Sequence, residues 1–113
     1  MIDFGKLGGL IPAVVQDAAS GEVLMVGFMN EEALAITRRT GSATFFSRTR
    51  NTLWTKGETS GNRLKVDRLL VDCDDDTVLL LVSCLGDGRV CHTGERSCFF
   101  RDLPLGDDKE RFQ

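Results

Sequence analysis

Potential metal ligands are concentrated in residues 71–99. This segment contains Asp72-Cys73-Asp74-Asp75-Asp76, Cys91-His92-Thr93-Gly94 and Ser97-Cys98-Phe99. Carboxylates suit hard cations such as Mg²⁺, whereas thiolates suit Zn²⁺. Because both kinds of ligand occur within one segment, the sequence predicts two metals rather than one. An apolar run at residues 78–82 could hold the two ends of the segment on a rigid strand.

The aspartates have more than one interpretation. If the chain is extended from Asp72 to Asp74, these two carboxylates share a face, Cys73 points to the other face, and Asp76 could rejoin them across a turn. An EF-hand is excluded because the sixth position of its loop would be Thr77 rather than the required glycine. A solvated acidic turn is the plain alternative.

The cysteines and the histidine suggest a zinc centre, although their spacing is not decisive. Cys91 and Cys98 form C-x₆-C, which is not a tight zinc signature, and they could instead be two small buried residues. Three cysteines with an open position would describe a catalytic zinc whose bound water is acidified. His92 would then be a proton carrier, with a surface or core-capping histidine as the alternative. Cys84 is expected to pack within a strand.

A basic middle part of the chain could receive an anion. Residues 38–68 have a net charge of +6, between segments of −4 and −5. The loop at residues 56–62 offers glycines, hydroxyl groups and backbone N–H groups that could form an anion nest, although it is not a P-loop. Nearby arginines could add guanidinium groups for phosphate. The alternatives are an ordinary polar loop and a solvated edge. The favoured substrate-binding residues are Arg48, Arg50, Lys56, Gly57, Thr59 and Ser60.

Composition limits the class of protein. The chain has 113 residues, 42% hydrophobic and 27% charged, which is ordinary for a globular domain. No apolar run is long enough for a membrane span, and no signal peptide is expected, so we predict a cytoplasmic protein. Four cysteines are then expected to be ligands or free thiols rather than disulfides. Net acidity, a single tryptophan and no tyrosine argue against nucleic acid as a partner.

The pattern of apolar residues predicts an α+β fold, mainly antiparallel β with one clear helix. We expect the helix to begin after an N-cap at Asn30, with Glu31 and Glu32 in its first turn, and to end at Thr40 before a C′ glycine, Gly41. Strands are expected at residues 11–16, 23–29, 43–47, 53–54, 64–73 and 77–83, the first two forming a hairpin. A single domain would cover residues 1–103, followed by a polar tail at 104–113.

Several of these motifs occur together in one known family. The chain resembles the phosphoribosyl-AMP cyclohydrolases of histidine biosynthesis. The resemblance covers most of residues 10–103 and rests on Ser47-Arg48-Thr49-Arg50, Trp54-Thr55-Lys56-Gly57-Glu58-Thr59-Ser60-Gly61-Asn62, Asp72-Cys73-Asp74-x-Asp76, Cys91-His92-Thr93-Gly94 and Ser97-Cys98-Phe99. The motifs keep one order, with the family's spacing.

The resemblance implies metals, an assembly and a reaction. It implies Zn²⁺ at Cys73, Cys91 and Cys98, and Mg²⁺ at Asp72, Asp74 and Asp76. It also implies an intertwined homodimer in which one zinc site takes ligands from both chains.

The implied reaction opens the adenine ring of 1-(5-phosphoribosyl)-AMP at the N1–C6 bond, giving the formimino-aminoimidazole carboxamide ribonucleotide. A zinc-bound hydroxide would attack C6 and His92 would move protons. There are two alternatives. The chain could be another zinc hydrolase or deaminase of nucleotides, or it could be a non-enzymatic module that binds metal or phosphate.

Overall fold

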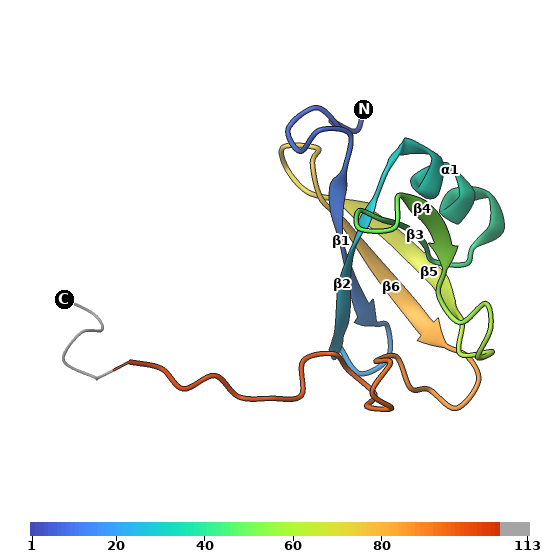
Figure 1. The fold of residues 1–113 in the computed structure, drawn as a ribbon, viewed down its shortest axis with the longest axis vertical. Helices are drawn as coiled ribbons and strands as arrows, with labels where there is room; N and C mark the ends of the chain where they lie inside the picture. Colours follow the sequence, from blue (N-terminus) through green and yellow to red (C-terminus); the bar gives the residue numbers. More distant parts are fainter. Residues whose placement is uncertain (107–113) are drawn as a thin grey trace.

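The computed structural model describes residues 1–106, which form one helix and six strands (Figure 1). The elements are β1 Ile11–Asp17, β2 Val23–Met29, α1 Glu31–Thr40, β3 Thr44–Ser47, β4 Thr52–Thr55, β5 Leu64–Val71 and β6 Val78–Cys84. Four strands make a sheet in the order β2-β1-β6-β5, and β3 pairs with β4 as a separate hairpin. The α+β class and the single helix are therefore as expected for these residues.

The four-stranded sheet is mixed rather than purely antiparallel. β1 and β2, β5 and β6, and β3 and β4 pair antiparallel, but β1 and β6 pair in parallel at the centre of the sheet. The chain can reach this parallel pairing because α1, the β3–β4 hairpin and β5 lie between the two strands in sequence. The prediction of a mainly antiparallel fold holds, with this central pair as the exception.

The core lies between the sheet and the elements on one side of it. Alternate residues of β1 and β6 are buried, as expected for strands with one covered face. Helix α1 buries Ala33, Leu34 and Thr37, and it packs with β3 against β2. Figure 1 shows α1 and the β3–β4 hairpin on the same side of the sheet. The hairpin that carries part of the basic segment is thereby attached to the core.

The helix begins and ends as its sequence predicts. The Asn30 side-chain oxygen accepts a hydrogen bond from the Ala33 N–H at 2.8 Å, which satisfies one of the unpaired donors of the first turn. Gly41 has a φ of 74°, and its N–H donates to the Thr37 carbonyl. A left-handed residue is needed at that position, and glycine adopts it without steric cost.

The aspartate segment differs from the extended conformation considered above. β5 ends at Val71 rather than at Cys73, and residues 72–77 form a turn. The Asp72 carboxylate accepts hydrogen bonds from the Asp76 and Thr77 N–H groups, at 3.0 and 3.2 Å. A short aspartate side chain competes in this way with the strand ladder for backbone donors, so the strand stops early.

The other predicted boundaries agree within one or two residues. Of the polar tail expected at 104–113, residues 107–113 lie outside the described part of the chain, and the domain boundary at 103 stays a prediction. In the described residues, no helix has the length and apolar character that crossing a membrane requires.

Gly27 permits the closest packing between the sheet and the hairpin. A Cβ at this position would lie 2.7 Å from Cδ1 of Phe45, which is fully buried. We expect Gly27→Ala to lower the free energy of unfolding by about 1–3 kcal/mol, as overpacking does. Urea denaturation measures this change. Gly5→Ala is the control, because its Cβ would meet the movable Asp3 side chain, and equal midpoints for both variants would contradict the prediction.

Candidate active site

Two loops meet at the end of the sheet where β6 finishes. The loop at 56–62 follows β4, and the loop at 85–98 follows β6. The Asn62 side-chain oxygen accepts a hydrogen bond from the Asp87 N–H at 3.1 Å. A Cβ on Gly86 would lie 2.1 Å from that oxygen, so the loops approach each other as closely as a glycine allows. This contact brings the basic segment against the cysteine-bearing segment.

Arg96 ties the cysteine-bearing loop to the β1–β2 hairpin. Its guanidinium nitrogens lie 3.2 Å from an Asp17 carboxylate oxygen and 2.9 Å from one of Glu22. Ser97 Oγ and the Cys98 N–H donate to carbonyl groups of β2 at 2.7 and 2.8 Å. Cys98 therefore has a backbone position set by the sheet rather than by a free loop.

The thiols of Cys91 and Cys98 lie close enough for each to affect the pKa of the other. The Thr93 hydroxyl donates to Cys91 Sγ at 3.1 Å, and this hydrogen bond lowers the pKa of Cys91. Partial burial of the Cys98 thiol raises its pKa, and the neighbouring Cys91 raises it further. Cys91 is thus the thiol of the pair that ionises more easily. Thiolates are the form that binds metal, so this pair fits two positions of a zinc site.

A cavity of about 490 Å³ opens beside Cys98. Its walls include Arg50, Trp54, Lys56, His92 and Cys98. A second cavity has a volume of about 390 Å³, and Lys56 and His92 line both cavities. The one histidine of the chain therefore stands between two hollows, beside a thiol and two cationic side chains.

The structure brings six of the thirteen predicted site residues to these cavities. Ser60 and Cys91 line the second cavity. Arg48 instead places its guanidinium 4.2 Å from the centroid of the Phe28 ring. Gly57, with a φ of 77°, shapes the 56–62 loop, because a Cβ there would lie 2.2 Å from the Asn62 backbone. Thr59 is exposed and is not among the residues that line either cavity in the described part of the chain.

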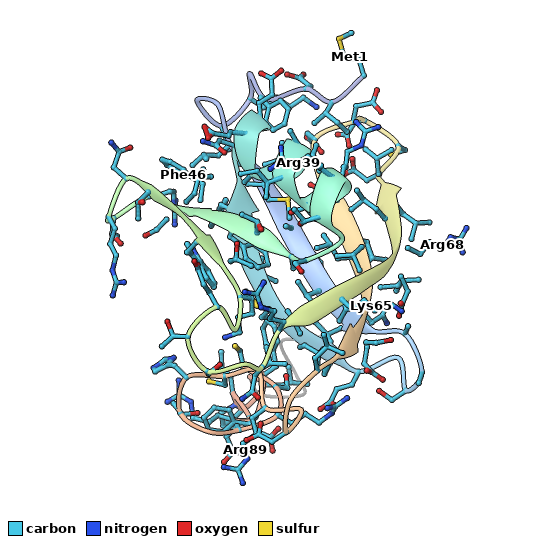
Figure 2. The ribbon with its side chains drawn as sticks, turned by 90° about the vertical axis from the view of Figure 1, so that its right-hand side faces the viewer. Met1, Arg39, Phe46, Lys65, Arg68 and Arg89 are labelled. Carbon is cyan, nitrogen blue, oxygen red and sulfur yellow. The ribbon has the colours of Figure 1, made fainter. Side chains whose placement is uncertain are left out.

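Sequence reasoning passed over three further residues of this region. Trp54 lines the larger cavity, Arg89 lines the smaller one, and Asn62 joins the two loops. Figure 2 shows Arg89 at the end of the molecule opposite Met1. Trp54 and Asn62 stand inside one of the family motifs, which is the signal that could have identified them.

The aspartates form a separate cluster. Oxygens of Asp72, Asp74 and Asp76 lie within 4.8 Å of one another. The neighbouring Asp72 carboxyl group raises the pKa of Asp74, whereas the Lys6 ammonium lowers that of Asp76. Lys6 Nζ lies 3.4 Å from Asp74 and 3.0 Å from Asp76. A cation already compensates the crowded carboxylates, and three oxygen ligands of this kind fit Mg²⁺.

Cys73 lies at the opposite end of the sheet from the other two predicted zinc ligands. It belongs to the turn before β6, while Cys91 and Cys98 follow that strand (Figure 1). Seven residues of strand span roughly 20 Å at about 3.3 Å per residue. Within residues 1–106, no cluster of three potential metal ligands includes a cysteine. Within one copy of the chain, two of the three predicted zinc ligands, Cys91 and Cys98, therefore lie near the cavities, and the third, Cys73, lies at the other end of the sheet.

Comparison with known proteins gives one consistent result. The profile of a family described as phosphoribosyl-AMP cyclohydrolase matches residues 25–100. A phosphoribosyl-AMP cyclohydrolase of Desulfatibacillum aliphaticivorans is 59% identical over 100 residues, covering 88% of this chain and 79% of that protein. A protein of the same name from Solibacter usitatus is 56% identical over 108 residues, covering 96% and 85%.

A longer relative matches in the same way. A histidine biosynthesis bifunctional protein of Yersinia pestis is 56% identical over 98 residues, covering 87% of this chain and 47% of that protein. The segment matched by the family profile contains Arg50, Trp54, Lys56, His92 and Cys98, which line the larger cavity.

The anchoring of the cysteine-bearing loop predicts an acid-sensitive contribution to stability. The pKa of Asp17 is lowered, first by the Ser20 N–H that it accepts and then by Arg96. A carboxylate whose pKa is lowered by folding stabilises the folded state at every pH above its pKa in the unfolded chain, which is near 3.8. This stabilisation is lost as the pH falls through the lower pKa of the folded state. We therefore expect Asp17→Asn to cost about 1–3 kcal/mol near neutral pH, and progressively less in acid.

Urea denaturation at about pH 7 and about pH 3 measures this dependence. Glu22→Gln is the matched control, because Glu22 pairs with the same arginine but its side chain is 42% exposed, and a surface pair contributes less than about 1 kcal/mol. A difference between Asp17→Asn and the unaltered protein that does not change with pH would contradict the assignment.

Proposed function

The chain belongs to the phosphoribosyl-AMP cyclohydrolase family, and we propose that it opens the adenine ring of 1-(5-phosphoribosyl)-AMP at the N1–C6 bond. The product would be the formimino-aminoimidazole carboxamide ribonucleotide of histidine biosynthesis. The observation that carries the proposal is the cavity where His92 and Cys98 stand beside Arg50 and Lys56. A proton carrier, a metal-binding thiol and groups for phosphate are what this hydrolysis requires.

The chemistry of the substrate explains why such a cavity suffices. A substituent on N1 withdraws electrons and leaves C6 of the purine electrophilic. Water adds its oxygen to C6, the C6–N1 bond breaks, and N1 leaves with a proton. His92 lines both cavities, so it can take a proton from the water and return one to N1.

The zinc ligands are proposed to be Cys91 and Cys98 of one chain and Cys73 of a second copy. Zinc, when bound, lowers the pKa of a coordinated water and thereby supplies a nucleophile near neutral pH. The Thr93 hydroxyl favours the thiolate form of Cys91 that such binding needs. The backbone anchor of Cys98 on β2 holds the second thiol in place.

Mg²⁺ is proposed to bind Asp72, Asp74 and Asp76. It would neutralise three carboxylates whose crowding already raises the pKa of Asp74. Lys6 contacts two of these carboxylates, so the metal would have to displace its ammonium or share them with it.

The substrate carries a phosphate at each end. Arg50 and Lys56 are proposed to bind one of them, because both side chains line the larger cavity. The loop with Gly57, Thr59 and Ser60 would contribute hydroxyl and backbone N–H groups. Arg48 was expected to join them, and it would have to leave its stacking position over Phe28 to do so.

A homodimer would complete the zinc site and cover an apolar surface. Val26, Val14, Leu79 and Leu70 form one row across the four strands, on the face opposite Ala13 and the rest of the core. Val26 is 45% exposed, and a hollow of about 360 Å³ opens over the other three. A second copy could bury this surface, because removing apolar area from water is favourable.

The cytoplasmic location stays a prediction.

Turnover of phosphoribosyl-AMP by the purified protein tests the proposed function. We expect ring opening, followed by absorbance, to vanish when zinc is removed with a chelator and to return when zinc is added. AMP is the control, because it lacks the N1 substituent and should not be hydrolysed. Turnover that persists without zinc would overturn the metal-dependent route, and hydrolysis of AMP alone would favour a nucleotide deaminase.

Metal content after substitution tests the two sites separately. Cys73→Ser should abolish zinc retention and activity, because it removes a ligand. Asp74→Asn is the matched control in the same turn, and it should weaken the response to Mg²⁺ while leaving zinc bound. Release of the same metal by both substitutions would contradict two distinct sites.

Mixing variants shows whether a site is shared between chains. Cys73→Ser and Cys91→Ser should each be inactive alone. In a mixed dimer, one site would carry both defects and the other neither, so partial activity should return. Mixtures that exchange subunits and remain inactive would contradict a site shared between two chains.

A further inference from the structure

We propose that Trp54 is the platform on which the purine ring of the substrate stacks, and that its indole face selects a positively charged N1-substituted purine over the neutral adenine of AMP. This inference rests on the proposed function and adds a residue that determines specificity. Three observations carry it: the place of Trp54 in the cavity, the support behind its ring, and the charges around it.

Trp54 stands where a bound base has to lie. It is the one tryptophan of the chain, it is partly exposed, and it lines the 490 Å³ cavity together with His92 and Cys98. A purine whose C6 reaches these two residues occupies the same cavity as the indole. A flat heterocycle beside a flat, partly exposed indole is the arrangement in which base stacking occurs.

The indole is held from behind by the core. Trp54 pairs with Phe45 across the β3–β4 hairpin, with their ring centroids 4.9 Å apart and their planes inclined by 32°. Phe45 is fully buried and packs against Gly27 of β2. The orientation of the platform is therefore set before any ligand binds, which limits the entropy lost on stacking.

The charges around the indole favour a particular form of purine. Lys56 Nζ lies over the Trp54 ring, 6.0 Å from its centroid, and Arg50 stands on the same cavity wall. A base that stacks on this face would have to move the flexible Lys56 side chain aside, towards a phosphate. Among the described residues that line this cavity, none is acidic. The phosphates of a nucleotide can pair with the two cationic side chains, whereas a positive charge on the base finds no carboxylate. The electron-rich face of the indole is the protein surface that can attract such a charge.

The substrate carries such a charge, and AMP does not. Substitution at N1 turns the N1–C6–N6 unit of adenine into a basic amidine, which binds a proton near neutral pH and spreads the positive charge over the ring. The adenine of AMP is neutral under the same conditions. The ring-opened product has lost the flat six-membered ring, and its C6 has become a carboxamide, while its basic group is now the open-chain N1–C2–N3 formamidine. An indole platform would therefore hold the substrate more tightly than either AMP or the product.

Fluorescence of the single tryptophan reports this stacking directly. We would titrate zinc-loaded His92→Ala, which lacks the proton carrier and so keeps the probe intact, with 1-methyladenosine 5′-monophosphate and with AMP. We expect saturable quenching by the methylated nucleotide, with an affinity roughly tenfold above that of AMP. Calorimetry supplies an independent binding curve. Calorimetric binding without a change in fluorescence would overturn the stacking, and equal affinities would overturn the charge selection.

Two substitutions measure the contribution of the platform to turnover. Trp54→Leu should raise KM for phosphoribosyl-AMP roughly 10- to 100-fold and change kcat little, whereas Trp54→Phe should keep KM within about threefold. Leu53→Ala is the control, because Leu53 neighbours Trp54 in β4 and also packs against the core. Thermal unfolding of each variant shows which substitutions weaken the fold.

The outcomes separate the two proposals. An unchanged KM in folded Trp54→Leu, or an equal increase in Leu53→Ala, would overturn the role of Trp54. Absence of turnover in the unaltered, zinc-loaded protein would overturn the proposed function, and the fluorescence titration would still decide whether the indole stacks on a charged purine.

Discussion

The central strand β6 is the constraint on which the arrangement of this chain depends. It pairs on one side with β1 and on the other with β5, and its residues Val78, Leu80 and Val82 are almost fully buried. A strand paired on both sides is extended over its seven residues, so the turn before it and the loop after it lie at opposite ends of the sheet. The carboxylates and Cys73 are thus separated from Cys91 and Cys98, and a zinc site with three thiols would need a second copy of the chain.

The separation also divides the charges. The carboxylate end carries its own counter-ion in Lys6, which comes from the N-terminal segment and contacts Asp74 and Asp76. At the other end, the larger cavity has Arg50 and Lys56 among its walls and no acidic side chain among the described residues that line it, whereas Asp87 lines the smaller cavity. Such a cavity favours an anionic ligand whose other part can interact with an uncharged aromatic surface. A nucleotide with a substituted purine has both features.

Local hydrogen bonds explain which predictions succeeded and which failed. The helix between Asn30 and Gly41 could be predicted because both of its caps depend on residues within four positions. Residues 72 and 73 were expected to continue the strand, because an alternating pattern does not show whether the Asp72 side chain will accept backbone N–H groups. The position of Arg48 over Phe28 depends on a partner twenty residues earlier, and no local pattern indicates it.

The sequence by itself determined most of the secondary structure and the family, because these follow from residue types and from spacing along the chain. The tertiary structure decided the parallel pairing of β1 with β6, the separation of Cys73 from Cys91 and Cys98, and the meeting of Trp54 with His92 in one cavity. These relations join residues that are far apart in sequence. Their contacts form only when the hairpin, the helix and the sheet pack around a shared core, and that packing is a property of the whole chain rather than of any segment.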